Sequence, residues 1–188
     1  MGQIRPHRPV LFISAVFSRY AEAIDWGRAK LVEHCGPLAL ESELFDFQET
    51  QYYERTMGPS IRKCFVAFDR LIDPAALVEL KILANQWEDE CRDQHSWPEP
   101  RPLNLDPGYL TEAKLILAST KDRDHRIYLD RGIFAEETLY FHHGEWRPRE
   151  WTYPNYRRAD YHRFFTRCRD YLRRRYQTES GRGIETET

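Results

Sequence analysis

The sequence lacks a long hydrophobic run. Its clearest apolar stretch, residues 10–17, is short and contains Ser14. Such a run is typical of a buried strand and not of a signal peptide or a membrane span. The mean hydropathy of −0.74 also argues against an integral membrane protein. With no targeting signal in sight, we expect the chain in the cytoplasm and not at a membrane.

The short motifs of several enzyme classes are missing as well. There is no G-x-x-x-x-G-K-[ST] phosphate loop, no G-x-G-x-x-G fingerprint, and no H-E-x-x-H or G-x-S-x-G motif. The four cysteines form no C-x-x-C pair, which excludes zinc-knuckle and thioredoxin-like motifs, and we expect them to be buried thiols. The sequence therefore indicates no metal site, names no cofactor, and leaves open whether the protein is an enzyme.

What the chain does contain is enough for one globular domain. It has 188 residues, of which 41% are hydrophobic and 14% aromatic, too many aromatics for a disordered chain. We expect residues 1–176 to form a single domain. Residues 177–188 are polar with two glycines, and we expect them to be a disordered tail.

Hydrophobic periodicity predicts an α+β fold. The first six expected elements follow one another in the order β-α-β-β-α-β, which is typical of a ferredoxin-like core. The Asp73-Pro74 pair gives the second helix a capped start. The expected strands are residues 10–17, 40–47, 61–71 and 103–105, and the expected helices are residues 20–35 and 74–93.

The core is expected to be extended by a short helix, an antiparallel meander and a final helix. Asp106-Pro107 repeats the capping pattern, so we interpret residues 107–119 as helix, with a strand as the alternative. Residues 125–149 alternate in polarity around two Gly-containing turns, as antiparallel strands do. Residues 158–176 carry an amphipathic stripe and form the C-terminal helix.

Charge is distributed unevenly along the chain. Residues 157–176 carry eight arginines against two aspartates, a local charge of +6, whereas residues 1–156 carry −6. Arginines among aromatics suit an RNA-binding surface, which is one functional hypothesis. We favour the interpretation that this helix docks on the acidic body, because that body would repel nucleic acid. The expected carboxylate partners are Glu79, Glu88, Asp89 and Glu90.

Polar side chains of many types crowd residues 104–140. In the expected meander, polar residues of two neighbouring strands share one face of the sheet. Such a face suits a small anionic or nucleotide-like ligand, although an ordinary solvated face with cross-strand ion pairs is the alternative. The candidate ligand-binding residues are Asp106, Lys121, Arg126 and Tyr128, and the candidate catalytic residues are His125 and Glu136.

Each candidate has an expected role. Lys121 and Arg126 would hold the anion, Tyr128 would stack on the ligand or hydrogen-bond to it, and His125 or Glu136 would move a proton. A competing hypothesis is a protein–protein interaction module without catalytic activity, because exposed aromatic residues anchor interfaces. Its anchors would be Tyr52, Tyr53, Trp97 and Trp151.

Several segments together resemble the bacterial domain of unknown function 4416 family. They are Asn-Leu-Asp-Pro-Gly-Tyr at 104–109, Ala-Ser-Thr-Lys-Asp at 118–122, His-Arg-Ile-Tyr-Leu at 125–129 and Trp-Thr-Tyr-Pro at 151–154. The resemblance implies a one-domain cytoplasmic bacterial protein with no established activity. Some family members carry an automatic GTP-binding label, so the resemblance adds GTP to the ligands to consider, here without a phosphate loop.

Overall fold

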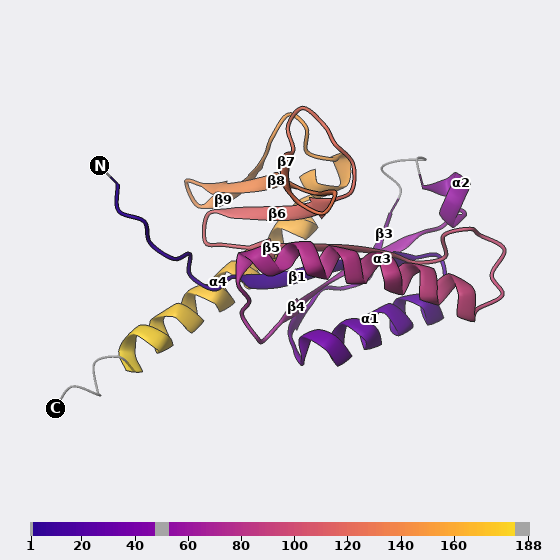
Figure 1. The fold of residues 1–188 in the computed structure, drawn as a ribbon, viewed down its shortest axis with the longest axis horizontal. Coiled ribbons are helices and arrows are strands. Elements are labelled where there is room, and N and C mark those ends of the chain that lie inside the picture. Colours follow the sequence, from indigo (N-terminus) through magenta and orange to yellow (C-terminus); the bar gives the residue numbers. More distant parts are fainter. Residues whose placement is uncertain (1, 48–52, 183–188) are drawn as a thin grey trace.

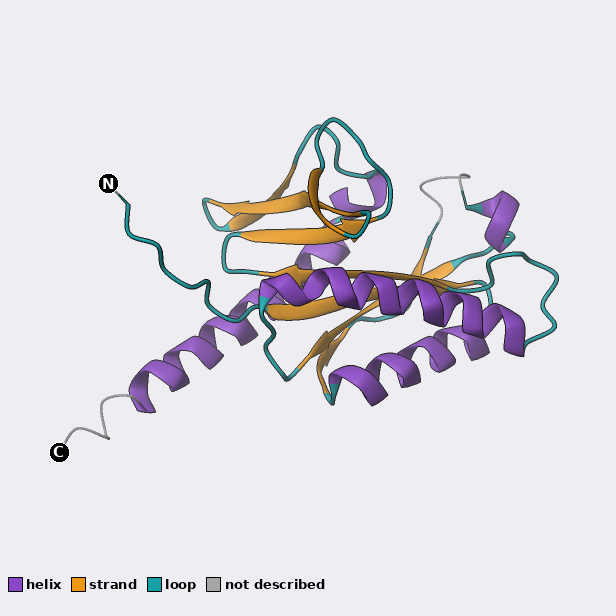
Figure 2. Cartoon of the chain, viewed as in Figure 1, coloured by secondary structure: helices purple, strands orange, loops and turns teal. Residues whose placement is uncertain are grey.

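Nine strands among the described residues form one sheet, which is antiparallel throughout (Figures 1 and 2). The structure is a computed structural model, and it describes residues 2–47 and 53–182. In chain order, the elements are β1 (Leu11–Ser18), α1 (Ala21–Cys35), β2 (Leu38–Glu41), β3 (Phe45–Asp46), α2 (Glu54–Met57), β4 (Arg62–Phe68), the 3₁₀ turn η1 (Pro74–Ala76), α3 (Leu77–Gln94), β5 (Asn104–Leu110), β6 (Lys114–Ser119), β7 (Ile127–Asp130), β8 (Ile133–His142), β9 (Glu145–Pro148), the 3₁₀ turn η2 (Pro154–Arg157) and α4 (Ala159–Arg182).

Helices cover both faces of the sheet. The strand order is β2-β4-β1-β5-β6-β8-β7, with β3 paired to β4 and β9 paired to β8. Every residue of β1 is buried, as its continuous apolar sequence predicts for a central strand. Phe12 and Val16 pack with α1 and α3, while Leu11 and Ile13 belong to the core under α4. The two cores therefore lie on opposite sides of the same strand.

The α+β class predicted from the sequence is confirmed. The first part of the chain follows the predicted β-α-β-β-α-β order and gives the strand order β2-β4-β1-β5. The predicted strand over 40–47 is interrupted and becomes β2 and β3. Assignment of this half of the sheet to the ferredoxin-like fold stays a prediction.

The helix predicted over residues 107–119 is wrong. Pro107 lies inside β5, opposite Ser14 of β1, and the apolar run after it becomes β6. Pairing with β6 begins only at Gly108, so Pro107 sits where the strand is paired on one side. The capping pattern was overridden because β5 fills the place between β1 and β6, where burial on both faces favours a strand.

The other Asp-Pro pair does begin a helical segment. The Asp73 carboxylate accepts a hydrogen bond from the Ala75 N–H at 2.8 Å, and η1 leads directly into α3. The C-terminal helix α4 begins one residue later than predicted and extends six residues further, to Arg182. Residues 183–188 of the expected tail lie outside the described residues. No helix of the described part of the chain is long and apolar enough to cross a membrane.

The expected partners of the Arg-rich helix are also wrong, because α4 and α3 lie on opposite faces of the sheet (Figure 1). Arg175 of α4 pairs with Asp69 at 2.7 Å, and Arg173 lies 3.4 Å from the Glu112 carboxylate. The acids expected to receive the helix instead pair elsewhere: Glu79 with Arg131, Glu88 with Arg101, Asp89 with Arg92, and Glu90 with Lys30.

Candidate functional site

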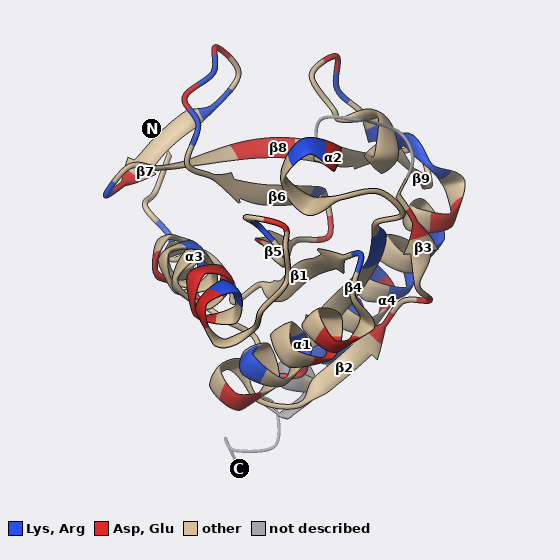
Figure 3. Ribbon diagram, turned by 90° about the vertical axis from the view of Figure 1, so that its right-hand side faces the viewer, with Lys and Arg blue, Asp and Glu red and all other residues tan. Residues whose placement is uncertain are grey.

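The sheet opens between β5 and β6. β5 pairs with β1 over its full length, but it pairs with β6 only over residues 108–110. Figure 3 shows β6 and β8 on the far side of β5 from β1 and β4. At the unpaired edge, Leu105 N–H donates to Glu88 Oε1 at 2.7 Å, and Lys81 Nζ donates to Leu105 O at 3.0 Å. Side chains of α3 thus replace a neighbouring strand there and satisfy the backbone.

A cavity of about 360 Å³ occupies this opening. Its walls come from β1, β4, β5, β6, β8 and α3, from the segments before α2, β5 and β7, and from the segments after β3 and β9. The lining residues that carry polar or aromatic groups are Phe17, Phe47, Tyr53, Lys63, Lys81, Asn85, Arg101, Asn104, Asp106, Ser119, Thr120, Lys121, Arg123, Arg126, Glu136, Tyr153, Asn155 and Tyr156. The volume lies within the range of small-molecule sites, at its lower end.

Positive charge dominates the lining. Six Lys or Arg side chains face two carboxylates, Asp106 and Glu136, which leaves an excess of four positive charges. Lys63 and Lys81 are only 1% and 5% exposed. Five aromatic ring centroids lie between 4.5 and 5.8 Å from the Lys63 ammonium, and ring faces stabilise a cation at such distances. The cavity is therefore suited to a ligand with negative charge.

Asp106 is the acidic centre of the buried end. Burial raises the pKa of its carboxyl, but the charges of Lys81 and Lys63 outweigh burial and lower the pKa below its ordinary value. Lys81 Nζ lies 3.7 Å from Asp106 Oδ1. Glu88, just behind, shows the opposite balance, because burial raises its pKa more than Lys81 and Arg101 lower it. Asp106 is thus the carboxylate that stays ionised and accepts hydrogen bonds.

Asn104 carries an unpartnered donor. Its side chain is buried, with 1% of the residue exposed, and lines the cavity on the same face of β5 as Asp106. The carboxamide is near enough to Asp106 to help lower the pKa of that carboxyl. Nδ2 nevertheless makes no hydrogen bond of accepted geometry with any described residue. A buried amide of this kind costs stability unless something else accepts from it.

Aromatic side chains form the apolar part of the walls. Phe17 and Phe47 lie with ring centroids 5.6 Å apart, and Tyr53 contacts both edge-on. Tyr156 is buried, and burial raises the pKa of its phenol well above 10, so the ring stays neutral. These faces could hold a planar ring by stacking or by edge contacts.

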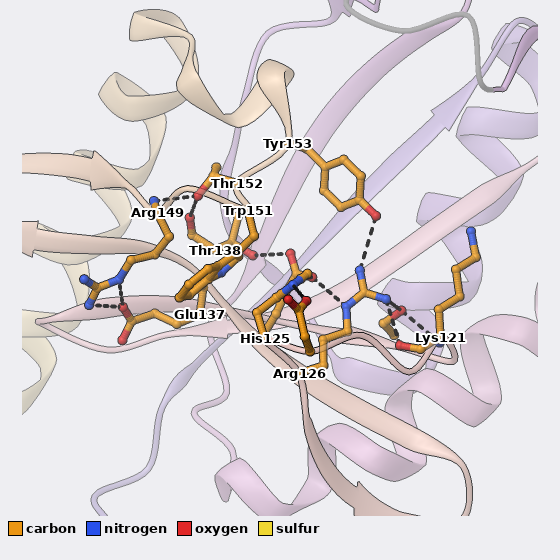
Figure 4. Close-up of polar contacts among 12 residues, drawn as sticks. Lys121, His125, Arg126, Glu137, Thr138, Arg149, Trp151, Thr152 and Tyr153 are labelled. Carbon is orange, nitrogen blue, oxygen red and sulfur yellow. Dashed lines mark hydrogen bonds and ion pairs between the residues drawn. The ribbon is translucent and has the colours of Figure 1, made fainter.

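Arg126 holds the cavity wall together (Figure 4). Its guanidinium donates to Glu136 Oε2 at 2.8 Å, Ser119 Oγ at 2.7 Å, Lys121 O at 2.8 Å and Tyr153 Oη at 3.2 Å. Four of the five N–H groups of an arginine are thereby used. Arg126 joins the loop after β6 to β8 and to the segment before η2, and one N–H remains to meet a ligand.

His125 lies beside the cavity and is not part of its lining. Its ring stacks on Trp151, with centroids 5.2 Å apart. Nδ1 lies 3.1 Å from Asp124, and Nε2 lies 3.4 Å from the buried Glu136 carboxylate (Figure 4). The imidazole thus connects an exposed carboxylate with one that faces the cavity.

The structure brings four of the six predicted site residues into one cavity: Asp106, Lys121, Arg126 and Glu136. His125 contacts Glu136 from outside. Tyr128 is elsewhere, on the edge strand β7, 58% exposed and edge-on to Phe134. Arg126 and Tyr128 do not share a strand face, because β7 begins at Ile127 and Arg126 belongs to the preceding loop.

Sequence reasoning missed Lys63, Lys81 and Asn104 as site residues. Two of them had a usable signal, namely a charge where the pattern demands an apolar residue. Lys63 follows Arg62 at the start of β4, whose remaining residues are apolar, and Lys81 stands in the apolar stripe of α3. Buried lysines are rare unless they are paired, so such positions deserve to be counted as candidates. Asn104 had no comparable signal.

The aromatic residues proposed as interaction anchors mostly pack against the chain itself. Trp97 stacks on Tyr20 at 4.9 Å, Tyr53 lines the cavity, and Trp151 covers His125 while remaining 39% exposed. Tyr52 lies outside the described residues. A role for Trp151 in binding a protein stays a prediction.

The described residues contain no group of three or more His, Cys, Asp or Glu side chains that could hold a metal ion. Their four cysteines are free and buried. Burial raises the pKa of Cys35 and Cys91 to about 11 and that of Cys64 to about 12. These thiols therefore stay protonated near neutral pH and are poor nucleophiles.

Comparison with known proteins gives one finding. The model of a family described as Domain of unknown function (DUF4416) matches residues 8–171, most of the chain. The searches of curated proteins and of solved structures found no match to this chain.

Proposed function

The chain belongs to the DUF4416 family, whose description names no function, and we propose that it binds a small anionic ligand in the cavity between β5 and β6. The observation that carries this proposal is the excess of four positive charges around an aromatic-lined cavity. Lys63 and Lys81 are buried and Lys121 and Arg123 are exposed, and the charges of all four would attract a bound anion. The cytoplasmic location expected from the sequence belongs to the same proposal.

Nucleotides are the ligands we rank first. They combine negative charge with a planar ring, and the cavity supplies both cations and aromatic faces. A volume of about 360 Å³ suits a mononucleotide better than a dinucleotide. GTP is included, held without a phosphate loop. The same features would suit other ring-bearing phosphates or carboxylates.

Catalysis is a narrower proposal. Glu136 faces the cavity and contacts His125, so the pair could move a proton to or from a bound ligand. However, Arg126 already holds the Glu136 carboxylate in an ion pair at 2.8 Å. We therefore propose ligand binding first and assign no reaction.

The test is a calorimetric titration of the purified protein with mononucleotides, nucleoside triphosphates and inorganic phosphate. The matched variants are Lys121→Gln and Arg123→Gln, whose exposed side chains line the cavity, and the control is Arg163→Gln on α4. We expect a tenfold loss of affinity in the cavity variants, about 1.4 kcal/mol, and none in the control. No binding at millimolar concentration, or equal losses in all three variants, would refute the proposal.

One observation favours RNA binding as a second candidate. Arg163, Arg167 and Arg174 are exposed on α4, and no carboxylate of the described residues pairs with them. Unpaired surface arginines can contact phosphates. A mobility shift with single-stranded RNA that weakens steeply with salt, and disappears in the triple Arg→Gln variant, would support this function. A shift that the variant leaves unchanged would exclude this helix as the surface.

A further inference from the structure

We propose that the ligand enters with a planar heterocycle first, and that Asn104 and Asp106 bind its hydrogen-bonding edge while its anionic group stays at the mouth. This inference rests on the proposed function and specifies the ligand class further, as a nucleotide bound with its base inward.

Asn104 and Asp106 present a donor beside an acceptor. They are alternate residues of β5, so their side chains point to the same side of the sheet, into the cavity. Nδ2 of Asn104 is a buried donor that lies near the Asp106 carboxylate but makes no hydrogen bond of accepted geometry with any described residue. Asp106 is held ionised by Lys81 and Lys63, so its oxygens only accept. The complementary group is a ring edge that carries an acceptor next to an N–H.

An anion would fit this end of the cavity less well. A phosphate could accept from Asn104 and would be attracted by Lys63 and Lys81, but Asp106 already receives the charge of these lysines and would itself face the phosphate. Like charges in close contact repel each other. A neutral ring edge satisfies both groups together. Nucleobases present such an edge, with a ring or carbonyl acceptor next to an N–H group.

The rest of the cavity fits the same orientation. The rings of Phe17 and Tyr156 lie at the buried end and can contact the faces of a base. Lys121 and Arg123 line the cavity but are exposed, so they belong to its mouth. In a nucleotide bound with its base inward, the phosphate on the ribose would point to these two cations at the mouth. Their positions therefore favour the orientation with the base at the buried end and the phosphate at the mouth.

The experiment compares ligands and variants in one calorimetric series. The probes are the four common ribonucleoside monophosphates, their nucleosides, and inorganic phosphate. For the base that binds best, a nucleoside with a methylated base-pairing edge is added. The variants are Asn104→Leu, which removes the unpartnered donor at similar volume, and Lys121→Gln at the mouth.

We expect the nucleoside to bind without its phosphate, and edge methylation or Asn104→Leu to weaken it at least tenfold. Lys121→Gln should weaken binding of the monophosphate about tenfold and leave that of the nucleoside unchanged. Thermal unfolding provides a second readout, because Asn104→Leu should leave the unliganded protein as stable as wild type or more so, as expected when an unpaired buried polar group is removed.

Two results would overturn the inference, and they differ in what they mean for the proposed function. Monophosphates that bind while nucleosides do not, with inorganic phosphate competing and Asn104→Leu without effect, would place the anion at the buried end and leave the proposed function intact. No binding by any probe would overturn both.

Discussion

The two parts of β5 have the same neighbour on one side and different neighbours on the other. Residues 108–110 pair with β1 and with β6, whereas residues 104–107 pair with β1 alone and receive Glu88 and Lys81 from α3 on the open side. A strand neighbour fills the space beside the backbone completely. Two side chains satisfy the same backbone groups and leave room, and the cavity occupies that room.

The difference explains why polar residues can face inward in only one part of the strand. Asn104 and Asp106 lie where the sheet is open and their groups can meet charged neighbours or a ligand. Gly108 lies where β6 approaches so closely that a Cβ atom would come within 2.3 Å of Ile116 O. A side chain is thus excluded at position 108, whereas the open part of the strand accommodates the polar side chains of Asn104 and Asp106.

The largest expected effect is loss of the side chain that replaces β6. Glu88→Ala leaves the buried Leu105 N–H without its acceptor and removes the ion partner of the partly exposed Arg101, so we expect a loss of about 3 kcal/mol in the free energy of unfolding. Urea denaturation measures it. Glu145→Ala is the control, because it breaks an exposed pair with Arg147 that contributes about 0–1 kcal/mol. Equal costs in the two variants would show that the open edge needs no acceptor.

The closed part of β5 can be tested by adding one methyl group. Gly108→Ala places Cβ against Ile116 O, backbone that cannot rotate away, and we expect a loss of about 1–3 kcal/mol. Gly2→Ala is the control, because no atom lies within 4 Å of the added Cβ. If the two variants unfold at the same urea concentration, the strands are not as close as the structure has them.

The charges at the open edge predict a distinctive pH dependence. Burial raises the pKa of Glu88 above 4.5 in the folded state, so the folded protein retains a proton that the unfolded chain releases. The free energy of unfolding therefore falls as pH rises from 4.5 through the raised pKa of the folded state. The pKa of Asp106 is lowered below 3.8, so its contribution is present above pH 3.8 and is lost as pH falls through the lowered value.

Each of these two groups can change the free energy of unfolding by at most about 1.4 kcal/mol per pH unit. Glu88→Gln should remove the fall in the free energy of unfolding above pH 4.5 and keep the fall at acidic pH. Asp106→Asn should remove the fall at acidic pH and keep the one above pH 4.5. Denaturation at a series of pH values from 3 upward measures both. Parallel profiles for wild type and Glu88→Gln would contradict the assignment.

The smallest expected effect is at Tyr128, far from β5. Its ring is mostly exposed on β7 and contacts Phe134 edge-on, so Tyr128→Ala should change stability by no more than about 0.5 kcal/mol. Nucleotide affinity should equal that of wild type in the same titration. A loss of affinity would show that the ligand reaches β7 and would move the site away from the open edge.

The sequence was sufficient to predict the type of a secondary-structure element wherever one strong pattern stood alone. The apolar run of β1, the capped start before α3 and the stripe of α4 each predicted the right type of element. It failed at residues 107–119, where a local capping pattern competed with long-range pairing to Ser14 and Leu117. Local patterns carry no information about which strand will lie alongside, so this choice required the tertiary structure.

The candidate site could be predicted only in part for a similar reason. Lys121, Arg126 and Glu136 lie close in sequence, and short loops bring them together. Lys63 and Lys81 come from β4 and α3, so they reach the cavity only through the order of the strands. A charge beside or within an apolar pattern marks them as unusual, but it does not reveal what they face.

The four buried cysteines give each face of the sheet its own chemical reporter. Cys168 packs in the core under α4, while Cys35, Cys64 and Cys91 pack in the core under α1 and α3. A thiol reacts with an alkylating reagent only when it is reached by solvent and ionised. Alkylation of the native protein, followed by mass spectrometry of each cysteine, would therefore time the opening of the two cores separately and reveal which helix layer separates first.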